Sequence, residues 1–213
     1  MPSTTFFNLP AEKRDKLLAA AIQEFRRVPY SEASINKIIQ TAEIPRGSFY
    51  TYFLDKEDLF LYLLTRYWGA LFPKGMQCLR ENDGDAFSLF YCLFDELRPD
   101  LPSEQRDRNV VELCDIMYIN ASVCPSVMTH FQQDLKAETQ IMDELLPAID
   151  VSRLWADTTE ELLTILRILY GQVILCLMGC LTGCYSASQA RLNLEAAFSL
   201  LRRGVMRPEQ SLS

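Results

Sequence analysis

The feature that most constrains this fold is a pair of short helical patterns separated by a three-residue break. Apolar residues recur at helical spacing within residues 34–42, and Ser34 is a favourable N-cap for that helix. The break is Glu43-Ile44-Pro45, and a second short helix is expected over residues 46–53. A longer amphipathic helix beginning at Pro10 precedes the pair. This arrangement predicts a helix-turn-helix with a supporting helix.

Residues 46–53 combine small, basic and aromatic side chains. At 100° per residue, Phe49 and Phe53 share one face and are expected to pack on the preceding helices. Small side chains point the opposite way and would let the backbone approach a groove floor; they are Gly47, Ser48 and Thr51. Cationic and tyrosyl groups that suit base edges or phosphates flank them; they are Arg46, Tyr50, Tyr52 and, at the next helix start, Lys56. A helix-turn-helix that packs on another protein remains an alternative.

The net charge of −7 would by itself argue against a nucleic-acid partner, because phosphates attract basic surfaces. Its distribution is uneven. Residues 10–56 hold eight Lys and Arg against six Asp and Glu, whereas residues 59–213 hold thirteen against twenty. The amino-terminal segment could therefore face a polyanion while the acidic remainder keeps the chain soluble.

The remaining chain predicts an all-α protein with a real core, because 49% of its 213 residues are hydrophobic and glycine is scarce. The first nine residues are expected to be a loose arm. Asp55 is expected to cap a long helix that runs toward residue 80. Further helices are expected at about 85–97, 106–121, 125–146, 158–184 and 188–204, with breaks at 82–84, 99–102, Pro125 and Pro147. Residues 168–181 predict a buried helix and no membrane span, since the run is shorter than about 20 residues.

The sequence argues against an enzyme, a zinc-type metal site or a bound cofactor. The chain has one histidine, His130, and neither a Ser-His-Asp arrangement, a phosphate-cradling glycine loop nor a metal quartet. Its seven cysteines form no disulfide framework, and no secretory signal pattern begins the chain. Reduced thiols in a cytoplasmic protein are the expected state.

The stretches "LPAEKRDKLLAAAIQEF" and "SINKIIQTAEIPRGSFYTYFLDKEDLF", within residues 9–62, resemble the DNA-binding domain of the TetR (tetracycline-repressor-like) family. The resemblance implies a helix-turn-helix DNA-binding domain over residues 1–58. It also implies a larger helical domain over residues 59–213 for dimerisation and ligand binding. Such a protein would be a homodimeric transcriptional regulator, usually a repressor, whose two recognition helices enter successive major grooves of a palindromic operator.

The resemblance also implies roles for individual residues. Those facing the bases or their flanks would be Arg46, Gly47, Ser48, Tyr50 and Thr51. Those holding phosphates would be Ser34, Tyr52 and Lys56, with Lys13 and the amino-terminal arm as further backbone contacts. The chain departs from the family at the turn, where Glu43 replaces the usual glycine and Pro45 replaces a common Ser or Thr. A non-glycine residue in a left-handed conformation costs on the order of 1 kcal/mol.

The last two expected helices are the favoured dimer interface, as the resemblance suggests. Glycines that permit close approach, and residues on one face of the final helix, form the candidate set: Gly171, Gly179, Gly183, Leu194, Ala197, Phe198 and Leu201. A helix buried within one subunit is the alternative. Thiols at i, i+4 and i+8 join this set, namely Cys176, Cys180 and Cys184. They suit soft-metal or oxidant sensing as well as small-residue packing, and these readings stay open.

An apolar cavity with a few polar groups is the usual form of a ligand site. Candidate lining residues for an unknown small hydrophobic effector come from the aromatic and methionine-containing stretches: Tyr67, Trp68, Phe90, Phe94, Met117, Tyr118, His130, Phe131 and Tyr170. Each also suits a core position. Effector binding would shift the long helix after Asp55 and change the spacing of the recognition helices.

Overall fold

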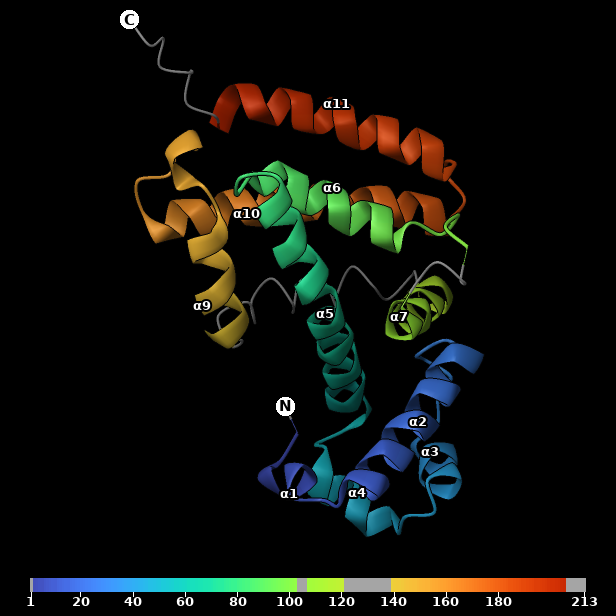
Figure 1. Ribbon diagram of the computed structural model, residues 1–213. Coiled ribbons are helices and arrows are strands. Elements are labelled where there is room, and N and C mark those ends of the chain that lie inside the picture. Colours follow the sequence, from blue (N-terminus) through green and yellow to red (C-terminus); the bar gives the residue numbers. More distant parts are fainter. Residues whose placement is uncertain (1, 103–106, 121–138, 206–213) are drawn as a thin grey trace, which may run out of the picture. The chain divides into compact units, whose positions relative to one another are not determined.

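The computed structural model describes residues 2–102, 107–120 and 139–205, and all regular secondary structure in these ranges is helical (Figure 1). The all-α class predicted from the sequence is therefore confirmed. The elements are α1 (Thr4–Phe7), α2 (Ala11–Arg27), α3 (Ile35–Thr41), α4 (Arg46–Tyr52), α5 (Lys56–Glu81), α6 (Ala86–Leu97), α7 (Arg108–Ile119), α9 (Thr139–Ala148), the 3-10 turn η2 (Val151–Arg153), α10 (Thr159–Leu181) and α11 (Ala187–Val205).

The described chain divides into two units, each with its own core. Residues 2–70 pack with residues 107–120, and residues 71–102 pack with residues 139–205. Helix α5 begins in the first unit and continues into the second. The boundary near residue 58 between a DNA-binding and a regulatory domain stays a prediction. The two packed units meet later in the chain, after Ala70 inside α5.

The first unit is built around α2. Leu17, Leu18 and Phe25 are buried on one side of this helix, whereas Lys13 and Lys16 are exposed on the other. The helix ends at Arg27 because the next residue is extended and precedes a proline, which disfavours helical backbone. The fully buried side chains of α3, α4 and α5 that complete the core include Ile38, Phe49, Leu59, Phe60 and Leu63.

The first nine residues are not the loose arm that the sequence predicts. Thr4–Phe7 form one helical turn, α1, and the Phe6 side chain is fully buried. The Phe6 ring lies 4.8 Å from the Phe53 ring and 5.3 Å from the Tyr62 ring, measured between centroids. The segment is ordered because it buries this large aromatic side chain, which stabilises the folded state by about 1.5–3 kcal/mol.

The second unit is centred on α10, which packs against both α6 and α11. A capping box starts α10: the Thr158 hydroxyl accepts the Glu161 N–H at 3.2 Å, and the Glu161 carboxylate accepts the Thr158 N–H at 2.9 Å. The Phe87 and Phe198 rings meet edge to face with centroids 5.4 Å apart, joining α6 to α11. The apolar side chains of α6, α10 and α11 thus pack together in one core.

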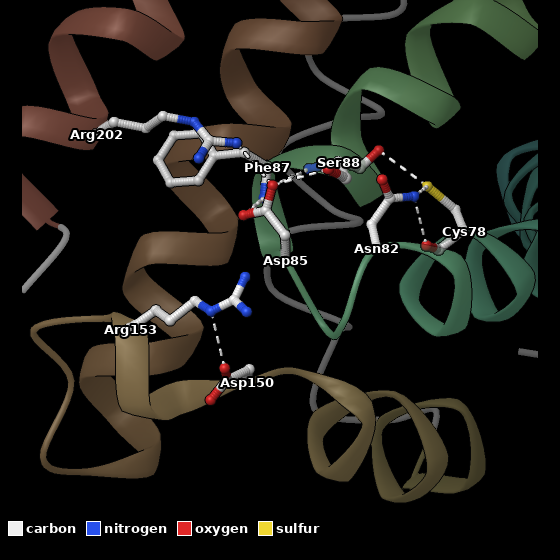
Figure 2. A network of polar contacts seen from close by, with 8 residues as sticks. All are labelled: Cys78, Asn82, Asp85, Phe87, Ser88, Asp150, Arg153 and Arg202. Carbon is white, nitrogen blue, oxygen red and sulfur yellow. Dashed lines mark hydrogen bonds and ion pairs between the residues drawn. The ribbon is translucent and has the colours of Figure 1, made fainter. Parts of the chain in front are cut away.

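A carboxylate at the start of α6 ties that helix to α11 (Figure 2). Asp85 is the N-cap of α6 and accepts the Ser88 N–H at 3.2 Å and the Ser88 hydroxyl at 2.7 Å. Arg202 of α11 donates to the same carboxylate at 2.6 Å and stacks over the Phe87 ring. Burial alone would raise the pKa of Asp85, but the bonds from Ser88 and Arg202 outweigh it and lower that pKa.

The break predicted at residues 82–84 is confirmed. Asp83 and Gly84 both have positive φ, and the Gly84 N–H donates to the Leu79 carbonyl at 2.8 Å. A Cβ at Gly84 would lie 2.6 Å from the Asp150 backbone nitrogen. Glycine is therefore required here both by the left-handed backbone and by the close approach of a second segment.

One helix boundary differs from the sequence expectation, and another cannot be compared with it. Pro147 does not break α9, which continues to Ala148. The proline lies next to the last residue of the helix, where it removes only one intrahelical hydrogen bond. The break predicted at Pro125 and the start of the helix predicted at 125–146 lie outside the described residues.

Helix α10 is longer than the apolar run that the sequence highlights. Its 23 residues make it long and apolar enough to cross a membrane by length and composition alone, and its most apolar 18-residue stretch has a mean hydropathy of 1.9. Half of the residues in that apolar stretch are buried inside the protein. Leu169, Val173 and Leu177 are among its buried side chains, which is the packing of a core helix.

Candidate nucleic-acid interface

Helices α3 and α4 are joined by a tight turn of the kind expected in a helix-turn-helix. The Ile44 N–H donates to the Ile39 carbonyl at 3.0 Å, and the Glu43 N–H donates to the Gln40 carbonyl at 3.2 Å. These two bonds form a Schellman motif, which satisfies carbonyls at the end of α3. Glu43 has φ 54°, so this non-glycine residue does take the left-handed conformation at the position where the family usually has glycine. Pro45 then occupies the N-cap of α4.

The Glu43 side chain turns toward α2, where its carboxylate forms an ion pair with Lys16. The hydrogen bond and the charge of Lys16 lower the pKa of Glu43. This pairing places a cation beside the only acid of the turn between α3 and α4. The negative charge that the turn brings near a candidate polyanion surface is thereby partly balanced.

Helix α4 has one buried and one exposed face, as the sequence predicts. Phe49 is fully buried and Phe53, the C-cap residue, is 1% exposed. On the other side Tyr50 is 50% exposed, and Arg46 is exposed with no polar partner among the residues that the structure describes. The buried rings hold the helix, while the exposed face keeps a cation and a phenol available to a partner.

The small residues of α4 leave open space above its backbone. Gly47 is exposed, and a Cβ placed there would meet nothing within 4 Å. Thr51 is exposed as well, and its hydroxyl donates to the Gly47 carbonyl at 3.2 Å. Ser48 is half-buried. Packing within the protein therefore does not require glycine at position 47. Contact with a binding partner is the reason that remains to be tested.

Ser34 occupies the N-cap position of α3, but its side chain makes no capping hydrogen bond. Its backbone N–H donates to the buried Glu24 carboxylate at 3.1 Å. Arg27 donates two further bonds to Glu24, and this contact holds the pKa of Glu24 below its usual value. The backbone of the α2–α3 loop is thus fixed, and the Ser34 hydroxyl is not used as a helix cap.

Lys56 takes a different position from the one expected of a phosphate contact. Its ammonium donates to the Tyr30 carbonyl at 2.6 Å and the Ala33 carbonyl at 3.0 Å, and lies 4.5 Å from the Tyr30 ring centroid. A third carbonyl, that of Ser31, is 3.5 Å away. Lys56 therefore holds the α2–α3 loop. Its phosphate role stays a prediction, and binding would require the ammonium to leave these partners.

Helix α7 packs on α2 within the first unit, a contact that sequence reasoning did not foresee. The fully buried Asn120 accepts the Tyr30 N–H at 2.6 Å and donates to the Ile116 carbonyl at 2.8 Å and the Phe25 carbonyl at 3.4 Å. Arg26 of α2 also pairs with an acid of α7. The helix-turn-helix is thus tied to a helix from the middle of the chain.

Two of the residues proposed for an effector pocket are buried beside α7. The Tyr67 hydroxyl donates to the Glu112 carboxylate at 2.9 Å, and Met117 is 2% exposed. Burial first, and then the bond to Glu112, raise the pKa of Tyr67, so the phenol stays protonated. Tyr118 is 63% exposed on the same unit, which places it outside an enclosed site.

The other pocket candidates belong to the second unit or are not described. Phe90 and Phe94 are buried in the second unit's core, and Tyr170 is half-buried there. His130, Phe131 and the side chain of Trp68 lie outside what the structure describes. The candidates are therefore spread over two units rather than gathered in one, and the effector site stays a prediction.

A groove of about 760 Å³ lies between α2, α5 and α7. Four arginines border it, namely Arg26, Arg27, Arg66 and Arg108, above apolar side chains that include Leu18 and Ile22. Three of the arginines have carboxylate partners in the same unit. Much of the positive charge of the groove is therefore balanced internally.

Four of the residues predicted for a dimer interface are buried within the subunit, whereas the interface itself stays a prediction. Leu194 and Phe198 are fully buried within their own subunit, and Cys176 is 4% exposed. Gly179 is covered by Tyr185, whose ring atoms would lie 2.0 Å from an added Cβ. These four side chains face inward because α10 packs on α6 and α11. The remaining candidates are half-buried or exposed, namely Gly171, Cys180, Gly183, Ala197 and Leu201.

A different set of apolar side chains on the same two helices faces outward. On α10 these are Ile168 (43% exposed) and Leu175 (61%), which are seven residues apart. On α11 they are Leu192 (57%) and Leu200 (66%), which are eight residues apart. Both spacings keep each pair on one side of its helix.

The cysteine stripe of α10 runs from the interior to the surface. Cys176 is buried, Cys180 is half-buried and Cys184 is exposed. Burial raises the pKa of both Cys176 and Cys180, which keeps these thiols protonated near neutral pH. No group of three or more potential metal ligands occurs among the residues that the structure describes. A redox or metal role for the stripe stays open.

The helices α2, α3 and α4, with the left-handed turn between the last two, define a helix-turn-helix protein. Residues 17–63, which run from α2 into α5, match the family described as bacterial regulatory proteins, tetR family. The amino-terminal part of the chain therefore matches the TetR family, in agreement with the resemblance seen in its sequence.

Named relatives match about a third of this chain. The HTH-type transcriptional repressor NemR of Escherichia coli (strain K12) is 30% identical over 74 residues, which cover 35% of this chain and 37% of NemR. The HTH-type transcriptional regulator YuxN of Bacillus subtilis (strain 168) is 29% identical over 72 residues, covering 34% of this chain and 25% of YuxN. The matched region thus spans little more than a third of these relatives at most.

Solved structures show that the likeness of fold extends further. A TetR transcriptional regulator from Rhodococcus sp. RHA1 has 21% identity and a TM-score of 0.52, covering 89% of this chain and 96% of that chain. A putative TetR family regulator from Vibrio parahaemolyticus has 18% identity and a TM-score of 0.51, covering 92% and 100%. The amino-terminal helix-turn-helix followed by a helical carboxy-terminal part is therefore a shared fold.

Proposed function

We propose that this protein is a cytoplasmic, ligand-responsive transcriptional regulator, a repressor, that binds a palindromic DNA operator as a homodimer. The observation that carries the proposal is the exposed face of α4, which we call the recognition face and define as Arg46, Gly47, Ser48, Tyr50 and Thr51. Phe49, buried behind it, fixes the orientation of this face.

The chemistry of the recognition face suits a major groove. An α-helix fits this groove, and arginine can bind a guanine edge through two hydrogen bonds. The open space over Gly47 would let the backbone approach the bases, and the exposed Tyr50 hydroxyl is a suitable donor to phosphate. The slight basic excess of residues 10–56 points the same way.

The sharpest test separates DNA binding from folding at Gly47. Because nothing lies near its added Cβ, Gly47→Ala should not harm the fold and should stabilise α4 by up to about 1 kcal/mol. In a groove, however, the extra methyl group would hold the helix away from the bases. We expect at least tenfold weaker binding to a duplex selected from a random DNA pool, with an unchanged or raised Tm.

Gly204→Ala is the matched control, because its Cβ also meets nothing within 4 Å and it lies at the end of α11. This variant should bind the selected duplex like the wild type. If Gly47→Ala also binds with wild-type affinity, α4 does not enter a groove as proposed.

The alternative, a helical protein-interaction module, is separated from DNA binding by salt. The logarithm of DNA affinity should fall linearly with the logarithm of salt concentration. Arg46→Ala should lower the slope by about 1 if the guanidinium contacts a phosphate, and should relax base preference at one position if it reads a base. A module that binds only protein would show neither effect and would enrich no DNA sequence.

For the homodimer we propose the outward apolar side chains of α10 and α11, namely Ile168, Leu175, Leu192 and Leu200, in place of the buried residues expected from the sequence. The exposed positions of these four apolar side chains on two adjacent helices support a four-helix interface with a second copy. Leu175→Glu should shift sedimentation from dimer to monomer at micromolar concentration. A wild-type chain that sediments as a monomer would reject this part of the proposal.

The effector is proposed to be a small hydrophobic molecule whose binding alters the helices that hold the helix-turn-helix. The contact of α7 with α2 supports this route, because Asn120 and Asp115 of α7 bind groups of α2 and its following loop. Enrichment of DNA from a random pool with and without candidate effectors would test it. Compounds that change neither the enriched sequence nor the affinity are not effectors.

A further inference from the structure

The carboxy-terminal end of α4 is capped by residues from the start of the chain. The last carbonyls of any helix lack intrahelical partners and need others. At the end of α4 the Thr51 carbonyl accepts the Ser3 hydroxyl at 2.6 Å, and the Tyr52 carbonyl accepts the Ser3 N–H at 2.9 Å. Forty-eight positions separate Ser3 from Thr51. A distant segment thus supplies a cap that α4 does not make for itself.

An aromatic anchor holds this capping segment in place. Phe6, fully buried, contacts Phe53 directly after α4 and Tyr62 from α5, and its ring centroid lies 6.4 Å from that of Tyr52. Ser3 also caps α1, since its hydroxyl accepts the Phe6 N–H at 3.4 Å. One residue therefore starts the short α1 turn and ends α4.

Neither of the two helices would be stable alone. Helix α1 has four residues and α4 has seven, whereas isolated helices shorter than about 12 residues are marginal in water. Their order must come from tertiary contacts. Docking of Phe6 and the two bonds from Ser3 are the contacts that connect them.

We propose that residues 2–7, which we call the amino-terminal clasp, are a positioning element that sets the sequence specificity of α4 without touching DNA themselves. This inference rests on the proposed function. By fixing the last turn of α4, the clasp holds the exposed Tyr50 and Thr51 in the geometry that base reading requires. Positioning within a few tenths of an ångström is the usual requirement for such a site.

The composition of the clasp separates positioning from direct phosphate binding. Residues 2–9 contain no charged side chain, so they bring no cation to exchange for counterions on DNA. The expected signature of the clasp is therefore a loss of specific binding with no change in salt dependence. A phosphate-binding arm would produce the opposite pattern.

Substitutions at Ser3 dissect the clasp. Ser3 has φ −70°, which proline can adopt, so Ser3→Pro removes both the N–H and the hydroxyl with little backbone change. Ser3→Ala removes the hydroxyl alone. Thr5→Ala is the matched control, because Thr5 is exposed in the same turn. Phe6→Leu tests whether a smaller apolar anchor still suffices.

Two measurements are made on the full-length protein: amide hydrogen exchange, and affinity for the selected duplex and for random-sequence duplex at several salt concentrations. Loss of two hydrogen bonds should speed exchange of the Phe53 amide, which closes α4, about tenfold. Specific binding should weaken about tenfold for Ser3→Pro and about threefold for Ser3→Ala. Random-sequence binding and the salt slope should stay at wild-type values, and Thr5→Ala should match the wild type throughout.

Three results would overturn the inference. Unchanged exchange at Phe53 in Ser3→Pro would show that the clasp does not hold the end of α4. Faster exchange with unchanged specific binding would show that the held end does not matter for reading DNA. A lower salt slope would show that the segment contacts phosphates directly. If the wild type binds no duplex, the proposed function fails instead, and the exchange data still decide whether Ser3 caps α4.

Discussion

Replacing Asn120 with alanine should loosen the attachment of α7 to the helix-turn-helix. Asn120 is fully buried, and its side chain makes three hydrogen bonds. Its oxygen accepts the Tyr30 N–H in the loop after α2, and its amide donates to the carbonyls of Phe25 and Ile116. Asn120→Ala removes all three bonds and adds none.

The cost follows from the groups that lose their partners. A buried donor left without a partner costs about 1–3 kcal/mol, and the bond that Tyr30 makes to Asn120 is the shortest of the three, at 2.6 Å. The Phe25 and Ile116 carbonyls lose a second, weaker contribution. We expect the free energy of unfolding to fall by about 2–3 kcal/mol. Denaturant unfolding of the full-length protein measures this change.

Hydrogen exchange localises the effect. Exchange of the Tyr30 amide should accelerate by at least tenfold in Asn120→Ala, because its acceptor is gone. Asn109→Ala is the control: Asn109 is exposed on the same helix and should change stability by less than about 0.5 kcal/mol. Wild-type exchange at Tyr30, together with wild-type stability, would refute the assignment of Asn120 as the link between α7 and the helix-turn-helix.

Three further predictions concern charged side chains. The pKa of Asp85 is lowered in the folded state. Its contribution to stability is therefore complete above its unfolded pKa near 3.8 and is lost as pH falls through the folded value. The Tm difference between the wild type and Asp85→Asn should be clear at pH 7 and shrink below pH 4. Glu43→Gly removes the cost of a non-glycine residue in a left-handed conformation and loses only an exposed ion pair with Lys16. Calorimetry should therefore show a Tm raised by a few degrees. Glu43→Gln keeps the backbone cost and should show no rise in Tm. Lys56→Met removes an ammonium bound by three carbonyls and should lower the free energy of unfolding by about 1.5–3 kcal/mol; denaturant stability equal to that of exposed Lys13→Met would contradict the loop-holding role.

Local chemistry was readable from the sequence. The apolar spacing of α2, α3 and α4 predicted three helices, and Glu43-Ile44-Pro45 predicted a tight break between the last two, because both signals lie within a few residues of the backbone they describe. The burial of Phe49 and the exposure of Tyr50 followed from helical geometry alone. The orientation of α4 within the helix-turn-helix was therefore predictable.

Partners distant in sequence were decided only by the tertiary structure. Lys56 looked like a phosphate contact because its position at a helix start suits anions, yet three loop carbonyls bind it. Ser3 and Phe6 looked like parts of a loose arm, although they cap and anchor α4. Nothing local in the sequence identifies an acceptor some fifty residues away.

Helix α10 shows why the buried side of an apolar helix was not predictable from the sequence. It is apolar nearly all round, so periodicity could not tell the side packed on α6 and α11 from the side left exposed at Leu175. A helix with polar contrast announces its buried face, whereas an apolar helix does not. The sequence by itself determined helices α2, α3 and α4 and which side of α4 is buried. Only the tertiary structure decided which apolar side chains are buried in the core and which stay exposed, because burial depends on the neighbours that each side of a helix meets in space.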